Sequence, residues 1–82
     1  MGIENRKFMT ELGEYLSKKS ASKAEISKKT KISKSRLSEL TLNASTQLRA
    51  RELYLIALAL DVDPCEMIKE IFNAVTLETE SN

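Results

Sequence analysis

Histidine is absent from this sequence of 82 residues, and cysteine occurs only once. Without histidine the chain lacks the most common metal ligand and general base, and a single cysteine excludes both an internal disulfide and a cysteine-rich zinc site. No combination of nucleophile, base and metal ligands is visible in the sequence. We therefore expect a protein that is not an enzyme and that has no cofactor and no metal site.

Glycine and proline are scarce too, with two and one residues, while 41% of the residues are apolar. This composition favours one compact helical domain over a sheet protein or a disordered chain. No apolar run approaches the roughly 18 residues of a membrane span, and the N-terminus lacks the apolar stretch of a signal peptide. We expect no membrane association and a cytoplasmic location.

Charge is distributed unevenly along the chain, although the net charge is only +1. Residues 17–36 contain eight lysines and arginines against one glutamate, a balance of +7. Residues 52–82 contain seven acidic residues against one lysine, a balance of −6. A basic segment of this kind is a candidate binding surface for a polyanion such as DNA. The alternative is a solvated, lysine-rich surface without a partner.

Hydrophobic periodicity and capping residues predict five helices, at about 6–19, 23–30, 34–41, 50–60 and 64–75. Ser22 and Glu25 form the pattern of a capping box at the start of the second helix. A turn is predicted near Lys31 and Ile32, because on one continuous helix Ile32 would face away from the neighbouring apolar residues. Ser33 is then the N-cap of the third helix. One long solvated helix is the alternative.

Other positions predict further local features. Gly13 interrupts the first helix and indicates close packing there, since glycine is unfavourable inside a helix. In the polar loop at 41–49, Asn43 is a candidate for a left-handed backbone conformation. Asp63 and Pro64 suit the N-cap and the first position of the fifth helix. The fourth helix is apolar nearly all round, which indicates burial on more than one side.

Two segments, KAEISKKTKISKSRLSEL at 23–40 and LIALALDVDP at 55–64, resemble the helix-turn-helix DNA-binding domain of the phage repressor and Cro family. The resemblance covers about residues 6–73 and implies an all-α, five-helix, lambda-repressor-like domain. We expect this domain to occupy residues 1–75, followed by a short frayed acidic tail at 76–82. The sequence departs from the family at Lys31, where a turn glycine is usual. Because the backbone there requires a positive φ, lysine should cost about 1 kcal/mol relative to glycine.

By the same resemblance, the helix at about 34–41 is the recognition helix, and its base-reading positions are Lys34, Ser35 and Glu39. Lys23 matches a position that contacts phosphate. Four further phosphate contacts are predicted from charge alone, at Lys28, Lys31, Arg36 and Arg49. An ion pair between Glu39 and Arg36 is an alternative role for both of those residues.

The resemblance implies a sequence-specific regulator that binds the major groove of double-stranded DNA, of the repressor or antitoxin type, with a toxin protein as a candidate partner. The alternative is a protein-interaction module that has the fold but no longer reads DNA. Excess apolar surface around the fifth helix predicts a symmetric homodimer. Its predicted interface residues are Leu55, Leu58, Val62, Met67 and Ile71.

Overall fold

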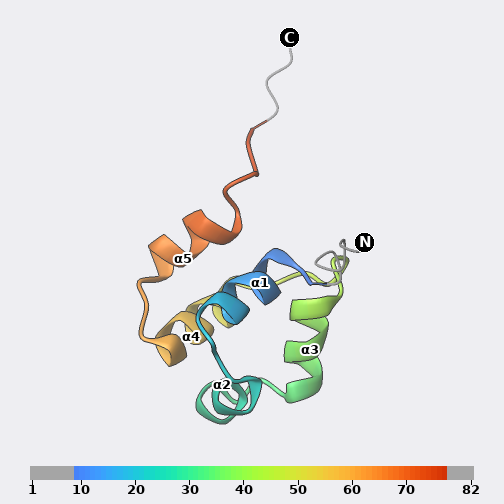
Figure 1. Cartoon of the computed structure of the whole chain (residues 1–82), viewed down its shortest axis with the longest axis vertical. Helices are drawn as coiled ribbons and strands as arrows, with labels where there is room; N and C mark the ends of the chain where they lie inside the picture. Colours follow the sequence, from blue (N-terminus) through green and yellow to red (C-terminus); the bar gives the residue numbers. More distant parts are fainter. Residues whose placement is uncertain (1–8, 78–82) are drawn as a thin grey trace.

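The computed structural model describes residues 9–77, and this part of the chain is an all-α domain without strands (Figure 1). Its five helices are α1 (Glu11–Lys18), α2 (Lys23–Thr30), α3 (Lys34–Leu42), α4 (Ala50–Leu60) and α5 (Pro64–Ile71). The predicted fold class is confirmed. The predicted start of the first helix near residue 6 is wrong: Met9 and Thr10 are not helical, and α1 begins at Glu11 because the Thr10 hydroxyl caps it by accepting from the backbone N–H of Gly13. Most of the predicted tail lies outside the described residues.

The turn between α2 and α3 has the predicted form. The Ser22 hydroxyl accepts a hydrogen bond from the backbone N–H of Glu25 at the start of α2, and the Ser33 hydroxyl accepts one from Arg36 at the start of α3. Lys31 ends α2 in the left-handed conformation, with φ 69°. The chain therefore reverses at Lys31, which brings Ile32 against the core.

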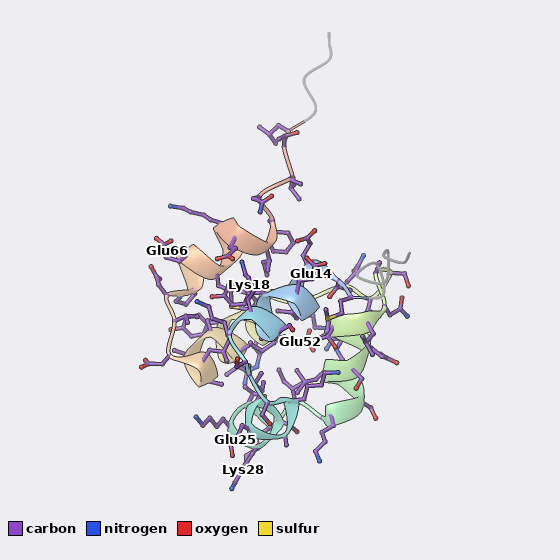
Figure 2. All side chains as sticks on the ribbon, viewed as in Figure 1. Glu14, Lys18, Glu25, Lys28, Glu52 and Glu66 are labelled. Atoms are coloured by element: carbon purple, nitrogen blue, oxygen red, sulfur yellow. The ribbon has the colours of Figure 1, made fainter. Side chains whose placement is uncertain are left out.

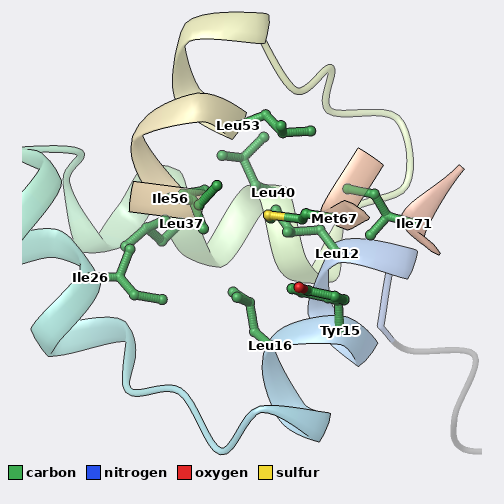
Figure 3. Packing of buried hydrophobic residues seen from close by; sticks show 11 residues of the cluster. Leu12, Tyr15, Leu16, Ile26, Leu37, Leu40, Leu53, Ile56, Met67 and Ile71 are labelled. Carbon is green, nitrogen blue, oxygen red and sulfur yellow. The ribbon is translucent and has the colours of Figure 1, made fainter. Parts of the chain in front are cut away.

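The core consists of side chains from all five helices (Figure 3). Its eleven buried apolar residues are Leu12, Tyr15, Leu16, Ile26, Leu37, Leu40, Leu53, Ile56, Ala57, Met67 and Ile71. α4 contacts α2 and α5, while α1 contacts α3 and α5. In Figure 1, α2 and α5 lie at opposite ends of the molecule. The fourth helix is not buried on more than one side as expected: its inner side is buried, whereas Leu60 is only partly buried and Tyr54 and Leu58 are exposed.

Met67 and Ile71 belong to this core, with 0% and 5% of their surface exposed. The expectation that they lack cover within one protomer, and are therefore available to a partner subunit, is wrong. The reason is that α5 places this face against α1 and α4. A lysine at either position would bury a charge, so such a variant would report on folding and not on assembly.

Two local predictions are also corrected. Asn43 has φ −113° rather than a left-handed conformation. Its side-chain oxygen accepts hydrogen bonds from the backbone N–H and the hydroxyl of Ser45, and this Asx turn directs the chain away from α3. α5 ends at Ile71, earlier than predicted. There the side-chain amide of Asn73 donates to the free carbonyl of Glu70, which satisfies a helix-terminal acceptor.

An ion pair between Lys18 and Glu70 connects α1 and α5 at the surface. The hydrogen bond between them raises the pKa of Lys18 and lowers the pKa of Glu70. Because both side chains are well exposed, solvent screens the pair and we expect little stability from it. Nearby, burial and then the negative charge of Glu70 raise the pKa of Tyr15.

Candidate nucleic-acid interface

α3 presents a polar surface on the side opposite the core. Leu37, Leu40 and Thr41 are buried, whereas Ser35 and Glu39, one turn apart on the other side, are exposed. Lys34 is exposed at the first position of the helix. The three predicted base-reading residues therefore share one accessible region of α3, which runs along an edge of the molecule (Figure 1).

Exposed basic residues flank this helix. Lys28 in the last turn of α2 and Lys31 in the turn are both exposed, and Figure 2 shows Lys28 pointing away from the rest of the molecule. Lys23 is partly buried at the first position of α2, and Arg49 is exposed immediately before α4. These positive charges lie on the segments that border α3 in the chain.

Arg36 has a different role from the one predicted. Its Nε donates to one carboxylate oxygen of Glu52 at 2.7 Å, and its Nη2 donates to the other at 2.9 Å. The same Nη2 donates to the backbone carbonyl of Gln47 at 2.9 Å. The Arg36 guanidinium thus donates its hydrogen bonds to groups of the protein itself. We therefore revise the prediction that Arg36 contacts a DNA phosphate. The alternative pairing with Glu39 is wrong too, because Glu52 is the partner.

This bidentate pair is well shielded from solvent, with 26% of the Arg36 side chain and 11% of the Glu52 side chain exposed. The hydrogen bond from Arg36 lowers the pKa of the Glu52 carboxyl group, and the same bond raises the pKa of Arg36. Glu52 also accepts from the backbone N–H of Arg49. One carboxylate therefore connects α3, the loop before α4 and the first turn of α4.

Glu52 is not among the residues predicted from the sequence, although the sequence contains an indication of its role. It is an acidic residue on the inner side of an otherwise apolar helix, one turn before the buried Ile56. A carboxylate in such a position needs a charged or hydrogen-bonding partner. The identity of that partner, sixteen residues earlier in the chain, is visible only in the structure.

The other end of α3 is held by α1. The hydroxyl of Thr10 donates to the carbonyl of Leu40 at 2.7 Å, and its backbone N–H donates to the carbonyl of Thr41 at 2.8 Å. A side chain on Gly13 would overlap with that carbonyl oxygen of Thr41. The close packing predicted at Gly13 is confirmed, and its neighbour is the backbone of α3.

A comparison with protein-family models agrees with this geometry. The model of the Cro/C1-type HTH DNA-binding domain matches residues 11–73. The protein belongs to this family. Searches of curated proteins and of solved structures found no match.

As a Cro/C1-type domain, the chain is a DNA-binding protein whose helix-turn-helix is formed by α2 and α3. The match covers all five helices, so the resemblance seen in the sequence is confirmed. Among residues 9–77 of this Cro/C1-type protein, no group of three or more potential metal ligands occurs. Over the same range, no helix has the length and hydrophobicity needed to cross a membrane.

Proposed function

We propose that this Cro/C1-type protein is a non-enzymatic, cytoplasmic regulator of transcription, of the repressor or antitoxin type, that reads a specific DNA sequence as a homodimer. The observation that supports the proposal is the exposed face of α3. Lys34, Ser35 and Glu39 are accessible there, while the opposite face is held by the core, by α1 and by Glu52. A helix held this firmly can present side chains to the major groove in a defined orientation.

Each of these side chains suits a different base edge. Lys34 can donate to O6 and N7 of guanine, Glu39 can accept from N4 of cytosine, and Ser35 can do either with its short hydroxyl. Lys23, Lys28, Lys31 and Arg49 would contact phosphates and set the orientation on the duplex. Arg36 would act indirectly, by holding α3 against the loop at Gln47 and against α4.

The proposal predicts different effects from phosphate and base contacts. Lys23→Ala should weaken binding to all duplexes and reduce the log–log salt slope by about 1, because one ionic contact is lost. Ser35→Ala should instead weaken binding to the best operator by roughly 1–3 kcal/mol and change the preference at one or two base pairs. Selection from random duplexes, followed by mobility shifts at several salt concentrations, measures both effects.

Two variants away from α3 serve as matched controls, Lys69→Ala on α5 and Ser17→Ala on α1, both at exposed positions. Neither should change the affinity or the salt slope. Equal losses on every sequence for Lys23→Ala and Ser35→Ala would contradict the proposed division of roles. If the folded protein bound no duplex at about 50 mM salt, sequence-specific regulation would be ruled out.

We propose that the dimer forms through the outer face of α5. The predicted interface is revised accordingly, because Met67 and Ile71 are buried and Leu55 and Val62 are partly buried. Leu58 on α4 is 56% exposed and stays a predicted interface residue. Ile68 and Phe72, one turn apart, are 43% and 44% exposed. Phe72 borders an open groove of about 680 Å³ whose lining includes Leu12, Leu40 and Leu48. A two-fold axis near this surface would allow each copy to cover the other.

We expect Ile68→Lys together with Phe72→Lys to give a folded monomer with much weaker operator binding. The two lysines would place like charges across a self-complementary surface, and they remain solvated in the monomer. Sedimentation at about 100 µM and circular dichroism measure assembly and folding. Glu66→Lys together with Lys69→Glu, at exposed positions of the same helix, is the control and should remain dimeric. A wild-type protein that is monomeric both free and on DNA would refute the dimer.

The second candidate function is a protein-interaction module without base reading. It is favoured by the same groove, together with the exposed Val75 and Leu77 in the segment that leads away from α5 (Figure 1). An antitoxin would use such a surface for its toxin. Selection from random duplexes separates the two functions, because an interaction module would enrich no DNA sequence.

A further inference from the structure

Leu42, the last residue of α3, is an exposed apolar side chain on the helix that faces DNA. It is 53% exposed, in contrast to its neighbours Leu40 and Thr41, which are 3% and 2% exposed. The other large apolar side chains exposed among residues 9–77 lie before α1, on α4, or on α5 and the segment after it. Leu42 itself does not line the groove that we assign to the dimer.

The helical positions place Leu42 with the base-reading residues. Ser35, Glu39 and Leu42 are spaced by four and three residues, so they share one stripe of α3. All three are exposed, and the stripe lies opposite Leu37 and Leu40. A single exposed leucine is common on protein surfaces and needs no explanation. Its alignment with two side chains directed at base edges is what indicates a function.

We propose that Leu42 is a specificity-determining residue that contacts the C5-methyl group of a thymine in the major groove. The inference rests on the proposed sequence-specific function and adds an apolar residue to the side chains that read bases. The methyl group of thymine is the apolar feature among the major-groove base edges, and 5-methylcytosine has the same group. Leucine gains from this contact by burying apolar surface, whereas a polar base edge in the same place would lose hydration without compensation.

The geometry of α3 also sets the position of the thymine. Leu42 follows Ser35 by seven residues, which corresponds to about 10.5 Å along an α-helix. Base pairs are spaced by about 3.4 Å, so this distance spans about three base pairs. Because a helix in the major groove is inclined to the DNA axis, this is an upper bound, and the contacted thymine should lie within about three base pairs of the pair that Ser35 reads, in each half-site.

Replacement of each operator thymine by uracil tests the contact, because uracil keeps the base pair and removes only the methyl group. With the full chain and the operator selected from random duplexes, we expect wild type to lose affinity about fourfold at one thymine of each half-site. Leu42→Ala should bind the thymine and uracil operators equally. Tyr54→Ala is the control, at 54% exposure on α4, and should keep the wild-type difference in affinity between the thymine and uracil operators.

A second set of operators carries 5-methylcytosine at each cytosine in turn. A fourfold gain in wild-type affinity on methylation of one cytosine, absent in Leu42→Ala, would show that Leu42 contacts methylated cytosine instead of thymine. If wild type bound its operator without any methyl dependence, or if Leu42→Ala kept that dependence, the inference would be overturned while the proposed function stood. Failure of the folded protein to bind any duplex would overturn both.

Discussion

Replacement of Glu52 by glutamine is expected to lower the free energy of unfolding by about 2–3 kcal/mol, because it leaves the shielded Arg36 guanidinium without its counter-charge. The amide has nearly the same shape, so packing in α4 is preserved. The contact between α3 and the loop at Gln47 should loosen as well, since Arg36 makes both bonds. Urea denaturation of the purified protein measures the loss.

A double-mutant cycle with Arg36→Met isolates the pair from its surroundings. The double variant should be less destabilised than the sum of the two single variants, because it no longer leaves one charge unpaired. Glu66→Gln, at an exposed position of α5, is the control and should change stability by less than about 0.5 kcal/mol. Strict additivity of the two single changes would show that the ion pair contributes nothing of its own.

The pH dependence of stability provides an independent check of the same pair. The pKa of Glu52 in the folded protein lies below its ordinary value of 4.5, owing chiefly to the hydrogen bond from Arg36. A carboxyl group with a lowered folded pKa contributes stability above its unfolded pKa, and this contribution is lost as the pH falls through the folded pKa. Wild type should thus lose stability on acidification below about pH 4.5, and Glu52→Gln should lose less over the same range.

We expect Gly13→Ala to lower the free energy of unfolding by about 2 kcal/mol, although alanine is normally favoured over glycine inside a helix by about 1 kcal/mol. The added methyl group would overlap with the Thr41 carbonyl oxygen, which is backbone and cannot turn aside. That carbonyl also accepts from the N–H of Thr10, so relief of the overlap would weaken a bond between α1 and α3.

Thermal denaturation followed by circular dichroism measures this change, which corresponds to a fall in Tm of about 8–16 °C for a domain of this size. Ser17→Ala, at an exposed position of the same helix, is the control and should be neutral or slightly stabilising. An increase in Tm for Gly13→Ala would mean that α1 can move away from α3 without loss. The close approach of the two helices would then not be required for the fold.

The sequence by itself determined the starts of the four helices α2 to α5 and the reversal at Lys31. The reason is that these features depend on interactions over a few residues. A hydroxyl or carboxylate cap bonds to a backbone N–H two or three residues later, as Ser22, Ser33 and Asp63 do here. The turn at Lys31 followed from the need to bring one apolar side chain, Ile32, to the same side as its neighbours.

Only the tertiary structure decided which surfaces are covered and which charges are paired. Periodicity shows that Met67 and Ile71 share a face of α5, but not that the same chain covers that face. The charge pattern marks Arg36 as basic, but its partner Glu52 is chosen by the packing of α3 beside α4. Gly13 indicates a close approach, and only the fold identifies the carbonyl of Thr41 as the group approached. Each of these contacts joins residues far apart in the chain, so local propensity and periodicity do not identify the partner.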